Sequence, residues 1–216
     1  MRLPLRLLLD RRDPAAERGR WPVELSGRTV GGESVRLRPL RRSDEEEFLR
    51  ARADNAAWLR PWDATSPLAR PVALDFRQYR SRLEAEATAG SALPFVIEHE
   101  DRIVGQLNVS SIIRGSFRSC TMGYWVIEEV AGRGFTPTAV ALAGDHVLGE
   151  LGLHRIEINV RPENHASLAV VRKLGMRDEG SRSRYLHIDG DWRDHRSFAV
   201  LAEEVGEGGL MGRLTS

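Results

Sequence analysis

Glu128-Glu-Val-Ala-Gly-Arg-Gly-Phe-Thr-Pro137 decides how this chain is read, because it joins two predicted elements of different kinds. Before it, the alternating residues 118–127 predict a β-strand, and after it the apolar-rich residues 139–151 predict a helix. Gly132 and Gly134 let the backbone turn with its amides pointing inward. The segment therefore predicts a strand, a tight turn and a helix in succession.

The same loop has the chemistry of an anion site. Thr136 followed by Pro137 is typical of a helix N-cap and a first helical residue. Free main-chain N–H groups that lead into the positive end of a helix dipole bind anions, above all a phosphate or pyrophosphate. Arg133 would add positive charge at the mouth. The alternative is that the two glycines only make a tight turn.

Two familiar phosphate-binding loops do not fit this segment. It has no Gly-Lys-Ser/Thr of a Walker loop, and Pro137 stands where a dinucleotide fingerprint has its third glycine. No βαβ repeat precedes the loop. An ATPase or a nicotinamide-dependent enzyme is therefore disfavoured.

Hydrophobic periodicity predicts the remaining elements. Strict alternation predicts a strand at 34–38, with Val35 and Leu37 facing inward. A capping box that begins at Ser43 predicts a helix to about residue 54, with Phe48 and Leu49 facing the core. Residues 55–71, rich in Trp and Pro, are expected to be irregular. Further helices are expected at 72–88 and 164–174, the latter ended by Gly175, and further strands at 93–98, 102–112, 155–160, 184–188 and 196–202.

Composition restricts the class of protein. The chain has 216 residues, 41% of them hydrophobic, with 32 basic against 31 acidic side chains, which is ordinary for a globular domain. A net charge of +1 predicts no direct nucleic-acid binding. No apolar run approaches the roughly 20 residues that span a bilayer, so no membrane partner is expected. Cys120 is the only cysteine and the histidines lack ligand spacing, which predicts no metal and a cytoplasmic location.

The order of these motifs resembles the GNAT N-acetyltransferase superfamily. The resemblance rests on the glycine loop, on Arg161-Pro-Glu-Asn-His-Ala-Ser167 and on Lys173-Leu-Gly-Met176, and it covers about residues 34–202. Within the superfamily, the match is nearest to the ribosomal-protein-alanine N-acetyltransferase branch of RimJ and RimL type. The loop departs from the superfamily pattern at Ala131 and Thr136.

The resemblance implies an α+β fold with a mostly antiparallel central sheet, splayed in the middle, and helices on both faces. We expect an N-acetyltransferase domain at 23–204, between an N-terminal extension at 1–22 and a frayed C-terminal tail at 205–216. Acetyl-CoA would bind as cosubstrate in a cleft between the strands that end near Ile127 and begin near Arg155.

The resemblance also implies roles for individual residues. The backbone of Tyr124 and Val126 would hold the pantetheine and the acetyl group, and Asn164 would contact the pantetheine arm. Ser167 would lie near the thioester sulfur as the candidate catalytic acid. The pyrophosphate would be held by the loop residues Gly132, Arg133, Gly134, Phe135 and Thr136.

The residues themselves leave two interpretations of the last motif open. Asn164 and Ser167 are three residues apart at a helix start and so share one face, from which both can reach a ligand. The alternative is that Asn164 only caps the helix by accepting a main-chain amide. A serine hydroxyl is a weak acid, but a thiolate whose conjugate acid has a pKa of about 8.5 is an undemanding leaving group.

Acetyl transfer needs a neutral amine. An α-amine with a pKa of about 7.7–8.0 is roughly 10–17% neutral at pH 7, whereas a lysine amine is only about 0.04% neutral. A site without a strong base therefore favours a protein N-terminus over lysine. Glu157 is the best candidate for a catalytic base, since it points off the apolar face of its strand. The alternative is a solvated carboxylate paired with Arg155 or another arginine.

Together with the resemblance, these patterns predict an enzyme that moves an acetyl group from acetyl-CoA to the N-terminal α-amine of a protein. The resemblance implies that the acceptor is a ribosomal protein. A monomer or a homodimer is expected. An acetyltransferase for small amines and a non-catalytic acyl-CoA-binding protein stay open as alternatives. The acidic turn at 189–194 is expected to be a solvated hairpin tip, with contact to a basic peptide as the alternative.

Overall fold

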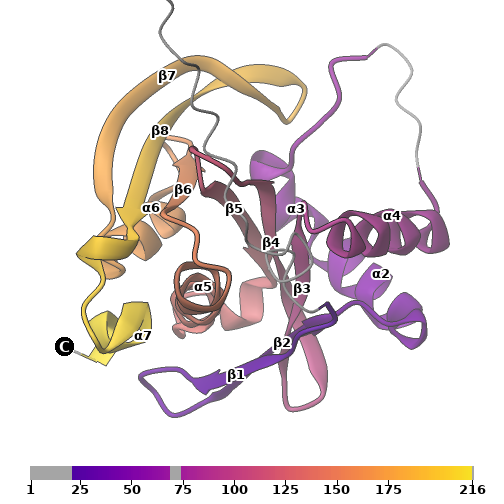
Figure 1. Ribbon diagram of the computed structural model, residues 1–216. Helices are drawn as coiled ribbons and strands as arrows, with labels where there is room; N and C mark the ends of the chain where they lie inside the picture. The colour runs from indigo at the N-terminus through magenta and orange to yellow at the C-terminus, as the bar shows by residue number, and fades with distance from the viewer. Residues whose placement is uncertain (1–20, 69–73, 216) are drawn as a thin grey trace, which may run out of the picture.

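The computed structural model describes residues 21–68 and 74–215, so the predicted extension falls almost wholly outside the described residues. One eight-stranded sheet has the order β1-β2-β3-β4-β5-β6-β8-β7, and helices cover both of its faces (Figure 1). The expected α+β fold is thereby confirmed. The strands are β1 (Leu25–Arg28), β2 (Ser34–Pro39), β3 (Leu93–His99), β4 (Arg102–Ile113), β5 (Ser119–Val126), β6 (Arg155–Val160), β7 (Arg177–Ile188) and β8 (Asp191–Leu201).

The helices differ in length and type. The α-helices are α2 (Glu45–Asp54), α3 (Ala56–Leu59), α4 (Phe76–Thr88), α5 (Phe135–Asp145), α6 (His165–Lys173) and α7 (Gly209–Thr215). Short 3-10 turns are η1 (Arg42–Asp44), η2 (Arg60–Trp62), η3 (Glu128–Val130) and η5 (Ala202–Glu204), and a π-helical turn, η4 (His146–Glu150), continues α5.

The sheet opens in its middle, between its two parallel strands. β5 and β6 are paired only where residues 119–121 meet residues 155–157. Beyond that point β5 stays paired with β4 as far as Val126, and β6 stays paired with β8 as far as Val160. All other neighbouring strands are antiparallel. The predicted splay is therefore confirmed, and it leaves a gap between the outer halves of β5 and β6.

Alternation along β3 shows how the two helical layers are held. Phe95 and Ile97 are fully buried and belong to the large apolar cluster that also contains Phe135 of α5. Val96 points to the other face and packs with Phe48, from α2. β3 is therefore buried on both faces, between the two helical layers.

The start of α2 differs from the prediction. Ser43 is not its N-cap, because a 3-10 turn precedes the helix. The buried carboxylate of Asp44 is instead paired with Arg38 at 2.7 Å. Phe48 is buried as expected, but Leu49 is 49% exposed, so its predicted place in the core is wrong. The helix therefore starts later than the capping-box pattern suggested.

Two further starts also differ. α4 begins at Phe76, after Asp75 has capped it by accepting the Gln78 N–H at 2.7 Å, and not at residue 72, which lies outside the described residues. β7 begins at Arg177, before the predicted start at residue 184. A short strand that the sequence analysis did not predict, β1, precedes β2 and pairs with it.

The frayed C-terminal end is also wrong. α7 packs against α5, and its Leu210 is 1% exposed. The Asp145 carboxylate at the end of α5 accepts the N–H groups of Leu210 at 2.6 Å and Met211 at 3.2 Å. The last helix is therefore part of the core.

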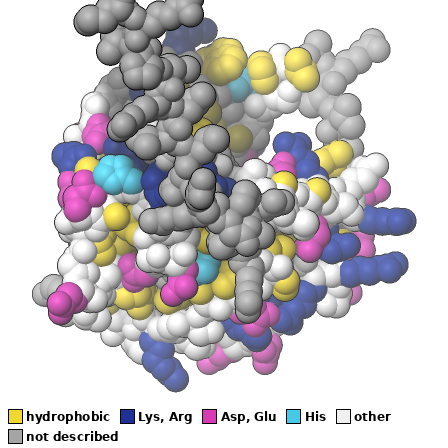
Figure 2. Space-filling view, viewed as in Figure 1, with side chains coloured by type: hydrophobic (Ala, Val, Ile, Leu, Met, Phe, Trp, Pro, Cys, Tyr) yellow, Lys and Arg dark blue, Asp and Glu magenta, His cyan; other side chains and the backbone are white. Residues whose placement is uncertain are grey.

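The surface carries both signs of charge. Figure 2 shows acidic and basic side chains interspersed on the face in view. In the described part of the chain, no helix is long and apolar enough to cross a membrane.

Candidate active site

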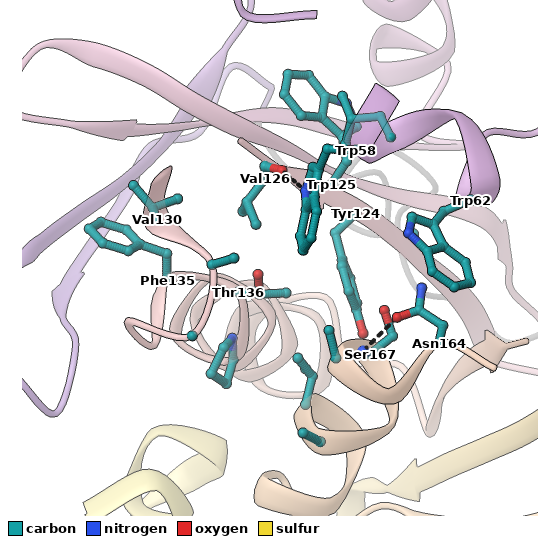
Figure 3. A pocket seen from close by; sticks show the side chains of 18 of the residues that line it. Trp58, Trp62, Tyr124, Trp125, Val126, Val130, Phe135, Thr136, Asn164 and Ser167 are labelled. Atoms are coloured by element: carbon teal, nitrogen blue, oxygen red, sulfur yellow. Dashed lines mark hydrogen bonds between the residues drawn. The ribbon is translucent and has the colours of Figure 1, made fainter. Parts of the chain in front are cut away.

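A pocket of about 560 Å³ opens where the sheet splays. Its walls come from β5, from the loop that begins α5, from the first turn of α6 and from the α3–η2 segment (Figure 3). The residues that line it include Trp58, Trp62, Asp63, Asn108, Tyr124, Trp125, Val126, Gly132, Gly134, Phe135, Thr136, Glu163, Asn164, His165 and Ser167. The structure thus brings the glycine loop and the Asn164–Ser167 motif to one cavity.

The glycine loop leads into a helix as predicted, but the N-cap residue differs from the predicted Thr136. Gly134, in the left-handed region at φ +92°, is the N-cap of α5, so Thr136 is the second helical residue and Pro137 the third. Gly132 also has a positive φ, of +80°. The main-chain N–H groups of Gly134, Phe135 and Thr136 find no acceptor among the described residues. With the helix dipole behind them, they are suited to an anion.

Arg133 does not line the pocket. Its guanidinium turns away to an ion pair with Glu33 and lies over the ring of Phe135, 5.5 Å from the centroid. The hydrogen bond to Glu33 raises the pKa of Arg133, so its charge is already balanced within the protein. The loop thus offers main-chain donors to an anion, whereas its one arginine serves the β1–β2 hairpin.

β5 presents main-chain groups to the gap. The Ile127 N–H bonds to the Val104 carbonyl of β4 at 2.9 Å. Because such groups alternate along an antiparallel strand, those of Tyr124 and Val126 point to the other side, where β6 has diverged. The Val126 carbonyl accepts the indole N–H of Trp58 at 3.1 Å (Figure 3). The main-chain groups of Tyr124 and Val126 therefore face the gap, and Trp58 is a neighbour that the sequence did not reveal.

The start of α6 brings the other predicted pair to the cavity. Asn164 is the N-cap, and its Oδ1 accepts the Ser167 N–H at 2.9 Å, so the capping interpretation is correct. Both residues also line the pocket, so the cap does not remove them from it. Tyr124 points at Ser167, and burial raises the pKa of its hydroxyl well above the ordinary range (Figure 3).

Glu157, the base predicted from the sequence, does not line the pocket. Its carboxylate is bonded to Arg155 at 2.9 Å, to Arg182 at 2.8 Å and to Asn159 at 3.0 Å. Burial alone would raise the pKa of Glu157, but these hydrogen bonds outweigh it and lower the pKa. A carboxylate held this way is a weaker base than a free one. The paired alternative describes it better.

At the end of the pocket away from the glycine loop, both carboxylates are paired with arginines. Asp63 is paired with Arg52 at 2.6 Å, and Glu163 is paired with Arg161 at 3.2 Å. The Arg161 guanidinium also lies 5.5 Å from the ring centroid of Trp62. This end therefore presents apolar walls and neutralised charges. The sequence signal for it was only the Trp- and Pro-rich irregular segment.

The β7–β8 hairpin tip rests against the same segment. The Asp189 N–H donates to the Asp63 carbonyl at 3.1 Å, and Thr65 is hydrogen-bonded to His187 at 2.8 Å. The acidic turn is thus exposed, as expected, but it is also bonded to a wall of the pocket. These bonds join it to residues 63–65, directly after η2.

A family model described as Acetyltransferase (GNAT) domain matches residues 34–177. The structure of Mycobacterium smegmatis RimJ in complex with CoA-disulfide is 38% identical, with a TM-score of 0.83, and the match covers 90% of this chain and 94% of that one. Escherichia coli ribosomal protein uS5-alanine N-acetyltransferase is 33% identical over 152 residues, 66% of this chain and 75% of that protein. Spermidine N(1)-acetyltransferase of Escherichia coli is 26% identical over 161 residues, 74% of this chain and 82% of that protein.

The fold and the site thus define an acyltransferase that uses acetyl-CoA. The match to the family model covers more than half of the chain. The chain belongs to the GNAT acetyltransferase family, and it is an acetyl-CoA-dependent N-acetyltransferase of RimJ type.

Proposed function

We propose that this enzyme acetylates the N-terminal α-amine of a protein, with a ribosomal protein as the acceptor. The observation that carries the proposal is the balanced acceptor end of the pocket, where Asp63 and Glu163 are both already paired with arginines. A polyamine carries several positive charges, and binding them in a cavity needs unpaired carboxylates. A peptide N-terminus brings one charge and loses it before it reacts. The kinship with the uS5-alanine enzyme supports the same acceptor class.

In the proposed mode of binding, the loop amides from Gly134 to Thr136 hold the pyrophosphate of acetyl-CoA at the positive end of α5. The pantetheine arm extends along the open edge of β5, where the main-chain groups of Tyr124 and Val126 face the gap, and it passes Asn164. The Val126 N–H is then placed to stabilise the oxyanion that forms on the thioester carbonyl. The thioester ends beside Ser167.

The proposed reaction is direct transfer in a ternary complex. The neutral amine attacks the acetyl carbonyl carbon, a C–N bond forms and the C–S bond breaks. The nitrogen loses one proton and the sulfur takes up one, which Ser167 supplies by its hydroxyl. Rate enhancement comes mainly from holding the two substrates together in the pocket. Deprotonating an α-amine costs over about 3 kcal/mol less than deprotonating lysine at the same pH.

An acceptor screen tests this proposal. We would offer the purified enzyme acetyl-CoA with three acceptors: peptides copied from ribosomal-protein N-termini, the same peptides with a blocked N-terminus but a free internal lysine, and spermidine. Acetylation of only the free N-termini is expected. Turnover of spermidine alone would support a small-amine enzyme, and acetyl-CoA binding with no turnover of any amine would support a non-catalytic role.

A cellular arm makes the assignment specific. Mass spectrometry of ribosomal-protein N-termini from a deletion strain is expected to find one or a few that have lost their acetyl group. An unchanged set would remove ribosomal proteins as acceptors.

A further inference from the structure

The Tyr124 hydroxyl is a buried polar group that does not stabilise the fold through an ordinary hydrogen bond. It forms no hydrogen bond of ordinary geometry with the described residues. The ring spans the pocket from β5 to the first turn of α6, and its hydroxyl ends against Ser167 (Figure 3). A buried hydroxyl without a partner destabilises a folded chain, whereas a phenylalanine of the same shape would not. The hydroxyl at position 124 therefore serves another purpose.

Ser167 is the side chain that this hydroxyl can serve. Its main-chain N–H is already bonded to Asn164 Oδ1 at 2.9 Å, so the backbone of Ser167 is fixed. Its hydroxyl, in contrast, can rotate, because one O–H bond can point in several directions from Oγ. A second donor aimed at Oγ would select the direction in which the Ser167 proton points. Tyr124 is the neighbour from which such a donor comes.

We propose that Tyr124 is a positioning residue that donates its hydroxyl hydrogen to Oγ of Ser167 and thereby directs the Ser167 proton at the thioester sulfur. This inference rests on the proposed function, in which the sulfur lies beside Ser167. When the C–S bond breaks, the sulfur takes the Ser167 proton. The proton that leaves the amine enters solvent, and solvent returns one to Ser167.

Tyr124 keeps its own proton throughout this cycle. Burial raises the pKa of its hydroxyl, so the phenol stays neutral and acts only as a hydrogen-bond donor. Its effect on the reaction therefore passes entirely through Ser167. That dependence separates Tyr124 from a second catalytic acid, and it can be measured.

A double-mutant cycle on turnover provides the test. Tyr124→Phe is expected to lower kcat about fivefold to tenfold and to leave the KM for acetyl-CoA within about twofold, since one hydrogen bond is lost and no binding contact. Ser167→Ala is expected to lower kcat at least as much. In the double variant, Tyr124→Phe should lower kcat no further, because its target is gone. Tyr185→Phe, the same change on β7 outside the pocket, is the matched control and should leave kcat unchanged.

Thermal unfolding of the same variants keeps the test independent of folding. Tyr124→Phe is expected to keep a Tm close to the wild-type value, because the substitution removes the hydrogen bond to Ser167 together with the buried hydroxyl and leaves the packing of the ring unchanged. A lower Tm together with a lower kcat would indicate a packing role and overturn the inference.

Two kinetic outcomes would also overturn it. If Tyr124→Phe left kcat unchanged, the hydroxyl would have no part in the reaction. If the two substitutions lowered kcat additively, Tyr124 would act on the thioester directly and not through Ser167. A wild-type enzyme that binds acetyl-CoA yet acetylates no amine would instead overturn the proposed function, and this inference with it.

Discussion

Gly134→Ala tests whether the glycine loop binds the pyrophosphate. Gly134 caps α5 at φ +92°, a conformation that costs a residue with a side chain about 1–2 kcal/mol. An added Cβ would lie 3.4 Å from Cβ of Thr29, so space is sufficient and backbone strain is the main cost. The loop can relieve that strain by turning the Phe135 and Thr136 amides away from the anion. Affinity would then fall by about fivefold to thirtyfold, since about 1.4 kcal/mol is a factor of ten.

Calorimetry with two ligands shows whether the loss is at the loop. Coenzyme A carries the pyrophosphate, whereas S-acetylpantetheine lacks it, so Gly134→Ala should raise the Kd of the first and leave that of the second unchanged. Gly149→Ala is the control, because it makes the same chemical change in η4, where a Cβ would meet nothing within 4 Å. Equal losses for both ligands, or an unchanged Kd for coenzyme A, would refute the assignment of the loop.

Four further outcomes are expected from stability and reactivity measurements. Leu210→Ala should lower the free energy of unfolding in urea by about 2–5 kcal/mol because its side chain is fully buried, whereas a frayed end would show no loss. Asn164→Ala should lower it by about 0.5–2 kcal/mol through the lost helix cap, and an unchanged value would contradict the capping role. Burial raises the pKa of Cys120 to about 12, so a disulfide reagent at pH 8 should label it only after unfolding, and rapid labelling of the native protein would contradict this. Glu157→Gln should destabilise the protein at pH 7, but progressively less as the pH falls below about 4.5, because the ion pairs that lower the pKa of Glu157 stabilise only its ionised form. An equal loss of stability at neutral and acidic pH would exclude the ion pairs as the cause.

Local patterns predicted most of the fold, and the failures have local or distant causes. The strands around β3 follow from the alternation of apolar residues. The end of α6 follows from Gly175, which has a left-handed backbone conformation. Both signals lie in neighbouring residues of the sequence. The predicted cap at Thr136 was wrong because Gly134 already caps the helix, which begins at Phe135. The prediction missed α7 because its burial depends on a distant residue, Gly144 of α5. An added Cβ at Gly144 would lie 2.4 Å from Leu210 Cδ1, so only glycine leaves room for Leu210. No pattern within a glycine-rich end reveals a groove on another helix.

The sequence could predict which residues line one side of the pocket, because one contiguous loop and one helix start supply them. The other side was not predictable, since the charge of Asp63 depends on Arg52, eleven residues earlier, and on how η2 folds back. Read from sequence alone, carboxylates near a pocket suggest a cationic acceptor, whereas their arginine partners make the wall neutral. Glu157 is also held in ion pairs, so the carboxylates of Asp63, Glu163 and Glu157 are all paired with arginines. Under the proposed function, selection then depends on the acceptor's own pKa, and an α-amine is the protein amine with a suitable pKa near neutral pH.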